Sequence, residues 1–203
     1  MRAVMWGGVI LAGLTAAPLV TASPPPGQNM EATALIESVR AATRRFEDVN
    51  AALAAGYVPD PSGECVTAEA HGAPAELGAM GIHYLRPDLL GFTVTAPRVD
   101  GTGTHTDFMN PAILLYEPQE DGSLVLVGVE NLVFRKAWES AGHGAPPVLA
   151  GRNWEYMVDD PTTPTEEAHH FEPHYDQHLW FRDNPNGNLE PFNPTVTCRH
   201  HKV

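Results

Sequence analysis

The chain has few basic residues for its length. It carries 12 Lys and Arg against 25 Asp and Glu, which leaves a formal net charge of −13 over 203 residues. Such a surface repels phosphate backbones and anionic lipid, so nucleic acid is excluded as an expected partner. Metal ions and cationic partners remain electrostatically allowed, although an acidic balance also serves solubility.

Local signatures of the common catalytic mechanisms are missing as well. There is no Gly-x-Ser-x-Gly elbow, no phosphate-binding Gly-x-x-x-x-Gly-Lys run, no His-Glu-x-x-His helix and no Cys-x-x-Cys-His haem attachment. The sequence therefore leaves open whether the protein is an enzyme.

Only two cysteines occur, Cys65 and Cys198. In an exported chain, an isolated pair this far apart is most simply one disulfide that closes a long loop. The alternative, two thiolate ligands of one metal ion, is weaker because neither cysteine has a Cys-x-x-Cys neighbour. We predict a Cys65–Cys198 disulfide.

The N-terminal segment predicts export. Arg2 precedes an apolar run of small residues over 3–20, and Ala22 offers a small side chain where a signal peptidase cleaves. A membrane anchor is the alternative, but glycines and a proline interrupt the run, which is also short for a span. We expect a signal peptide over 1–22, a proline-rich leader over 23–30 and a single α+β domain over 31–203. The mature protein would be secreted or periplasmic, without stable membrane insertion.

Apolar periodicity predicts an α+β domain with a mainly antiparallel sheet and an N-terminal amphipathic helix packed on it. Apolar side chains recur at three- and four-residue intervals over 31–55, and Gly56 is placed to end that helix. Beyond Tyr57, short apolar runs separated by proline, glycine and aspartate favour strands. The expected strands are 82–85, 92–95, 113–116, 124–130, 153–158 and 174–181.

Four stretches occur together and in order along the chain. They are Gly-Ala-Met-Gly-Ile-His-Tyr at 78–84, Leu-Val-Gly-Val-Glu at 126–130, Pro-Pro-Val-Leu-Ala-Gly at 146–151, and 174–198 with its His-x-x-x-His-x-Trp, Asn-Pro-x-Gly and Asn-Pro-x-Val-x-Cys motifs. This combination resembles a group of uncharacterised small secreted bacterial proteins. The resemblance covers most of the mature chain and implies no particular activity.

The segment that begins at His174 is rich in groups that bind metals or move protons. It places His174, Asp176, His178 and Trp180 within seven residues. On a helix, the two imidazoles would share one face and could chelate a single ion. On a strand they would lie roughly 13 Å apart, too far to share an ion. We favour the strand, because its alternation separates Tyr175 and Leu179 from the two histidines.

A metal site then needs partners from neighbouring strands. His83 and Glu130 are the best candidates, since alternation would aim each side chain away from its apolar neighbours. With one of His174 and His178, or with each at a separate position along a cleft, they would form a His/His/Glu or His/His/His/Glu set with an open position, which suits zinc, copper or iron. Alternatively, His83 is a hydrogen-bonded core residue and Glu130 pairs with an arginine.

We therefore hold two hypotheses. In the first, an exported domain binds a divalent transition metal and carries it, or uses it in chemistry on a small molecule, with Tyr84 and Trp180 beside the metal ligands. In the second, a disulfide-linked binding module receives a small apolar ligand or peptide in an aromatic cleft and holds no metal. His169 and His170 are expected on the surface. The catalytic residues, the oligomeric state and the ligand stay undetermined.

Overall fold

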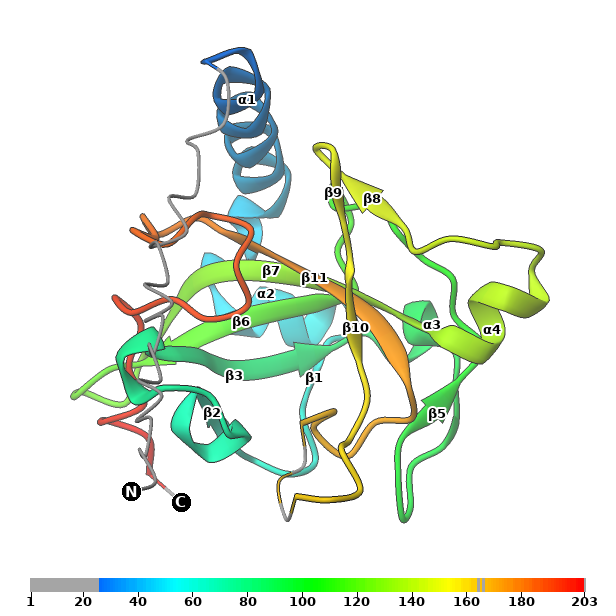
Figure 1. Ribbon diagram of the computed structural model, residues 1–203. Helices are drawn as coiled ribbons and strands as arrows, with labels where there is room; N and C mark the ends of the chain where they lie inside the picture. The colour runs from blue at the N-terminus through cyan, green and yellow to red at the C-terminus, as the bar shows by residue number, and fades with distance from the viewer. Residues whose placement is uncertain (1–25, 164, 166, 203) are drawn as a thin grey trace, which may run out of the picture.

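A single antiparallel sheet forms the centre of the computed structural model, which describes residues 26–163, 165 and 167–202 (Figure 1). The sheet has seven strands, in the order β1-β3-β6-β7-β11-β10, and β2 pairs with β3 beside this path. Their bounds are β1 Val58–Pro59, β2 Cys65–Thr67, β3 Ala79–Leu85, β6 Ile113–Pro118, β7 Leu124–Phe134, β10 Glu155–Met157 and β11 His174–Trp180. Every neighbouring pair in it is antiparallel. The predicted α+β class with a mainly antiparallel sheet is confirmed.

Smaller elements surround this sheet. Two short hairpins pair β4 (Phe92–Val94) with β5 (Asp100–Gly101) and β8 (Val148–Leu149) with β9 (Arg152–Asn153). The remaining helical turns are η2 (Glu69–His71), η3 (Ala75–Leu77), α3 (Pro87–Leu90) and α4 (Arg135–Ser140). The expected strand over 92–95 therefore lies outside the central sheet. The signal peptide predicted over 1–22 lies outside the described residues.

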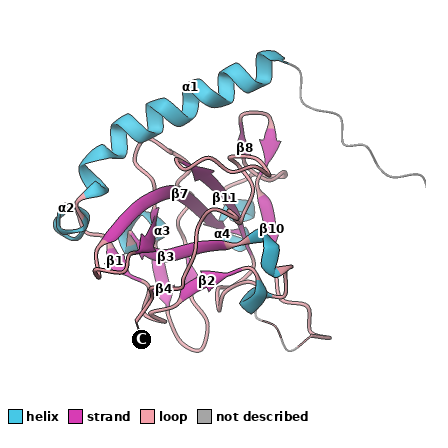
Figure 2. Cartoon of the chain, turned by 90° about the vertical axis from the view of Figure 1, so that its left-hand side faces the viewer, coloured by secondary structure: helices cyan, strands magenta, loops and turns pink. Residues whose placement is uncertain are grey.

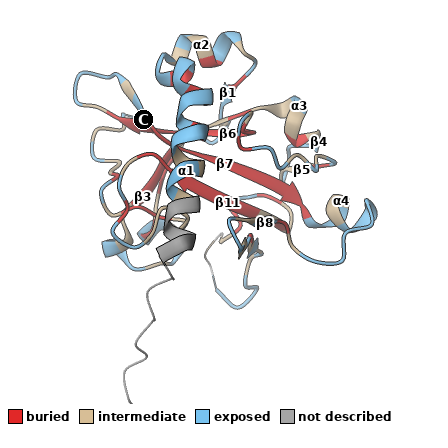
Figure 3. Ribbon diagram, turned by 90° about the horizontal axis from the view of Figure 1, so that it is seen from above, coloured by how far each residue is buried: buried red, intermediate tan, exposed pale blue. Residues whose placement is uncertain are grey.

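Three successive helical segments stand where one helix was predicted. They are α1 (Pro26–Thr43), the 3₁₀ turn η1 (Arg44–Glu47) and α2 (Val49–Ala54). Asp48 separates the last two because it is extended and its carboxylate accepts a hydrogen bond from the Asn50 backbone amide, which caps α2. Val39 and Phe46 are buried in one cluster with residues of the sheet. Figure 2 shows α1 lying along the outside of the sheet, and most of it from residue 32 onward is exposed (Figure 3). Among the described residues, no helix is long and apolar enough to cross a bilayer.

The two faces of the sheet carry different cores. On one face, Leu114, Tyr116, Val129 and Leu179 pack with the helical segments in one cluster. The second cluster, which includes Leu85, Ile113, Leu115, Leu132 and Trp180, covers the other face. Side chains alternate along a strand. The polar residues that occupy the same alternate positions as members of the second cluster therefore project from the second face.

The disulfide between Cys65 and Cys198 is present, as predicted. It joins β2 to the C-terminal segment across 133 residues of sequence. Nearby, the ring Nε2 of His201 contacts the Gly63 carbonyl at 2.8 Å. The end of the chain is therefore fixed beside the edge strand that pairs with β3.

The asparagine-rich turns after β11 are structural. The Asn184 side chain accepts a hydrogen bond from the Asn186 amide and donates one to the Phe192 carbonyl. Asn193 is fully buried and its backbone exchanges hydrogen bonds with Ala79 at the start of β3. These contacts are the turn chemistry that asparagine favours, and they tie the C-terminal segment to the sheet.

Candidate metal centre

The pairing of β7 with β11 places His178 directly opposite Glu130. Residues 174–180 form a strand, so His174, Asp176, His178 and Trp180 share one face while Tyr175 and Leu179 face the other core. The Nε2 atom of His178 lies 3.4 Å from Oε2 of Glu130. Both side chains are almost fully buried, with relative exposures of 2% and 5%.

His83 reaches the same carboxylate from two strands away. It lies on β3, and β6 runs between β3 and β7 with Ile113 opposite Glu130. Strands two positions apart in a sheet are separated by about 10 Å, a span that the long side chains of His and Glu can bridge together. The Nε2 atom of His83 lies 3.3 Å from Oε2 of Glu130.

The three side chains offer one ligand atom each, and these atoms all lie within 4.8 Å of one another. A metal ion bound at about 2.0–2.2 Å in tetrahedral geometry has ligand atoms about 3.3 Å apart. The two contacts to Glu130, at 3.3 and 3.4 Å, match that spacing. They are longer than charge-assisted hydrogen bonds, which measure about 2.7–2.9 Å. His83, Glu130 and His178 could thus hold a metal ion.

Two of the three ligand atoms lack a hydrogen-bond partner. Oε2 of Glu130 and Nε2 of His178 are both buried, and neither makes a hydrogen bond of normal geometry with a described residue. Leaving a buried polar atom unpaired costs about 1–3 kcal/mol, and more for a charged group. A cation placed between the three side chains would satisfy both atoms. Among the described residues, no other group of three His, Cys, Asp or Glu side chains converges in this way.

The electrostatics favour an ionised carboxylate. Burial raises the pKa of Glu130, but the charges of His178 and His83 outweigh burial and lower it below its ordinary value. Burial likewise opposes a charged imidazole at both histidines. At His83, the close Glu130 carboxylate prevails and the pKa is raised, whereas at His178 burial prevails and the pKa is lowered. The site therefore holds a buried anion beside imidazole nitrogens, which is an environment for a cation.

His174 lies on the same face but does not join the three-residue group. Its Nδ1 contacts the Glu172 carbonyl at 2.9 Å, and its Nε2 is 3.9 Å from Oδ2 of Asp176. Burial lowers the pKa of His174 to about 4, so the ring is neutral. Burial, followed by the charge of Glu130, raises the pKa of Asp176 well above its ordinary value. His174 and Asp176 are thus a neutral pair beside the group.

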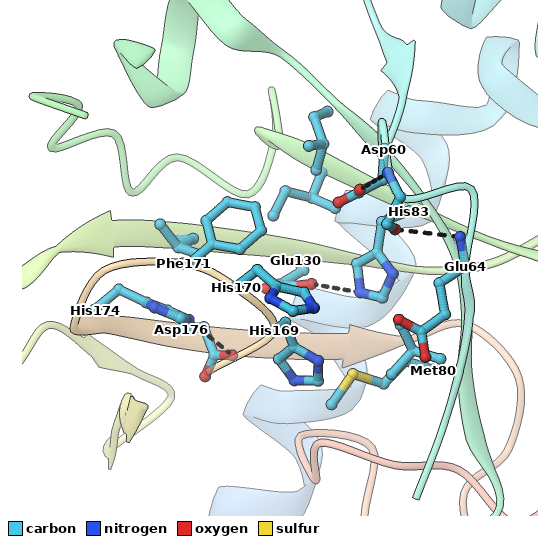
Figure 4. A pocket seen from close by; sticks show the side chains of 15 residues that line it. Asp60, Glu64, Met80, His83, Glu130, His169, His170, Phe171, His174 and Asp176 are labelled. Carbon is cyan, nitrogen blue, oxygen red and sulfur yellow. Dashed lines mark hydrogen bonds and ion pairs between the residues drawn. The ribbon is translucent and has the colours of Figure 1, made fainter. Parts of the chain in front are cut away.

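A small cavity adjoins the group (Figure 4). Its volume is about 40 Å³, and His83, Glu130, His174 and Asp176 all border it. Met80, Leu85, Ile113, Leu132 and Phe171 form apolar parts of its wall. His178 does not border this cavity and lies behind it, stacked on Trp180 with ring centroids 6.0 Å apart. An ion held by the three ligands would lie beside the cavity, because His83 and Glu130 border it.

His169 and His170 both line the cavity, which the sequence analysis did not predict, although His170 is exposed, as expected. His169 differs more from its prediction. It was predicted on the surface, but both of its ring nitrogens are buried, and its ring packs on His71 with centroids 4.0 Å apart. Backbone contacts of Val99 with His170 and Glu172, each 2.8 Å, anchor the loop that carries it. A polar stretch after Glu166 and Glu167 gives no periodic signal, so nothing in the local sequence could have identified this position.

The two aromatic candidates occupy different places. Tyr84 projects from the opposite face, where its ring meets Tyr116 at 5.0 Å, so it does not lie beside the group. Trp180 is fully buried and donates a hydrogen bond to the Glu190 carbonyl at 2.6 Å. Gly128 leaves room for the indole, because a Cβ atom there would lie 2.9 Å from it. Neither Tyr84 nor Trp180 borders the cavity.

His105 and Asp107, in the loop before β6, make local contacts. Nε2 of His105 contacts the Asn110 carbonyl at 2.7 Å, and the Asp107 carboxylate accepts a hydrogen bond from the Met109 amide. These contacts organise the turn before β6 and leave both residues outside the group.

The fold and the group together define an α+β protein with a candidate site of two histidines and one glutamate on a sheet face. No family model, curated protein or solved structure matches the chain. The function therefore has to be argued from the chemistry of these residues.

Proposed function

We propose that the protein is an exported metal-binding protein that holds one divalent transition-metal ion between His83, Glu130 and His178. The observation that carries this proposal is the convergence of the three ligand atoms within 4.8 Å, at spacings that fit metal coordination. The Cys65–Cys198 disulfide supports an oxidising compartment, since such bonds persist in secreted and periplasmic proteins.

The donor set narrows the choice of ion. Two neutral imidazoles and one carboxylate serve catalytic zinc sites and non-haem iron sites, and imidazole also suits copper. Such a set neutralises only one of the two positive charges on the ion. The ion would keep an electrophilic open position, at which it could polarise a small molecule or lower the pKa of a bound water. Metal carriage and metal-assisted chemistry both use this property.

The alternative of a metal-free aromatic cleft has less support. His174 is satisfied by a backbone carbonyl, as that alternative requires, but His83 and His178 converge on a carboxylate. The cavity is also too small for a peptide or an aromatic ligand, because about 40 Å³ admits only a few water-sized groups.

Elemental analysis tests the proposal. The mature, tag-free protein is purified from an oxidising compartment without chelator, beside a His83→Ala/His178→Ala variant and an exposed control, His143→Ala. We expect close to one zinc, copper or iron ion per chain in the parent and the control, and none in the double variant. A parent that holds no ion and takes up none of the three on titration would refute the metal site.

A further inference from the structure

The cavity beside the candidate metal group contains a second unsatisfied polar side chain, His169. Its ring Nδ1 and Nε2 are both buried, and neither makes a hydrogen bond with a described residue. Burial, followed by the nearby imidazoles, lowers its pKa well below the ordinary value, so the ring is neutral. A neutral imidazole offers one donor and one acceptor. His169 can therefore both give and receive a hydrogen bond inside the cavity.

His83, Glu130 and His169 line one common space. All three border the same cavity, with the first two also belonging to the metal group (Figure 4). His169 comes from a separate segment, the loop before β11, which Arg98 holds through an ion pair with Asp159 at 2.5 Å. The imidazole is thus presented to the cavity independently of the sheet that carries the metal ligands.

The size of the cavity limits what can lie between them. One water molecule needs about 10–15 Å³ of such volume, so 40 Å³ accommodates roughly three water-sized atoms. Apolar side chains such as Met80 and Phe171 form part of the wall, and polar residues that include Asp60, Ser62 and Glu64 complete the lining. A sugar, nucleotide or amino acid would have to extend out of this space.

We propose that the cavity is the binding site for a molecule of two or three heavy atoms, which coordinates the metal at one end and accepts a hydrogen bond from His169 at the other. This inference rests on the metal site proposed above and names the class of ligand that the site takes. Small oxygen- or nitrogen-containing molecules have this chemistry. His169 acts as a positioning residue and is not a metal ligand.

Azide is a suitable probe, because it is a linear three-atom molecule that binds metals end-on. The full-length mature protein is loaded with cobalt(II), whose visible absorption reports changes in coordination, and titrated with azide. We expect saturable binding to the parent. In His169→Asn, azide should bind at least about tenfold more weakly, as loss of one hydrogen bond to an anion predicts, while cobalt stoichiometry stays unchanged. Asparagine suits this position because it tolerates the positive φ of 53°.

Two comparisons make the result decisive. His143→Asn, which changes an exposed histidine, should bind azide as the parent does. Imidazole, a five-membered ring, should bind the parent cobalt site far more weakly than azide because it exceeds the cavity. Equal azide affinity in the parent and His169→Asn would overturn the role of His169, and tight imidazole binding would overturn the size limit. Failure of the parent to take up cobalt would instead refute the metal site itself.

Discussion

His178 and Glu130 face each other as direct cross-strand partners on β11 and β7, with 3.4 Å between Nε2 and Oε2. Side chains alternate between the faces of a sheet, so a register shift of one residue would move His178 to the opposite face. The apolar residues Leu179 and Val129 fix the correct register, because both are fully buried in the core on the other side. Core packing thus determines the geometry of two of the three proposed ligands.

Substitution of Glu130 and of His174 distinguishes a proposed metal ligand from a buried residue beside the group. Glu130→Gln keeps the shape of the side chain but removes the charge, and we expect zinc affinity to fall on the order of 100-fold or more. His174→Gln should change the affinity by less than about threefold, because His174 lies outside the converging group. Competition with a chromophoric chelator measures both affinities. Equal losses in the two variants, with both still folded by circular dichroism, would contradict the three-ligand site.

Metal removal should lower stability. The buried Glu130 carboxylate loses its cation, and any ion that binds only the folded state stabilises it by about 2.7 kcal/mol at 100 times its Kd. For a chain of this size, that corresponds to a decrease in Tm of roughly 5–10 °C. Differential scanning calorimetry of parent protein with and without chelator measures it. The His83→Ala/His178→Ala variant is the control, and its Tm should not respond to chelator. A parent Tm that is equally insensitive would argue against the site.

The sequence predicted the strand alternation but only part of the site. Period-two alternation over 174–181 placed His178 opposite in direction to Leu179, and the same logic aimed Glu130 away from Val129. Strand neighbours depend on long-range pairing, which one sequence does not encode locally, so the convergence of His83, Glu130 and His178 was a hypothesis until the order β3-β6-β7-β11 was known. The expected strand separates His174 from His178, and only His178 joins the group.

His169 illustrates a different limit. Its burial depends on a loop held by Arg98 and by backbone bonds to Val99, contacts between segments about 70 residues apart. Such a loop has no hydrophobic periodicity, and its polar neighbours in the sequence are typical of an exposed segment. Tyr84 is a different case. It follows His83 directly on β3, and because adjacent side chains on a strand point to opposite faces, it lies on the face opposite to His83.

The neutral state of His174 predicts a loss of stability in acid. Its pKa is lowered to about 4 in the folded protein, compared with about 6.5 in the unfolded chain. Between pH 6.5 and pH 4, the unfolded chain therefore binds more protons at this ring than the folded protein does. The free energy of unfolding has its full contribution from this ring above pH 6.5 and declines as the pH falls towards 4. The loss is on the order of 3 kcal/mol.

Urea unfolding of metal-free protein at several pH values between 7.5 and 4 measures this effect. Other groups titrate in the same range, so the comparison with His174→Gln isolates the contribution of this ring. The variant should show the shallower decline in its free energy of unfolding. Parallel curves for parent and variant would show that His174 is already protonated, or exposed, in the folded state.

The Cys65–Cys198 disulfide should support stability without supporting the metal site. It closes a loop with a sequence separation of 133 residues, which the chain-entropy model values at about 4–5 kcal/mol through restriction of the unfolded chain. The three proposed ligands lie on β3, β7 and β11, and none of these strands contains a cysteine of the pair.

We expect Cys65→Ser/Cys198→Ser to unfold at lower urea concentration while it still binds one metal ion per folded chain. Urea titration gives the first quantity, and elemental analysis at low temperature gives the second. Loss of metal from variant protein that remains folded would show that β2 and the C-terminal segment hold His83 in place, because Cys65 pairs with Ile82 beside it.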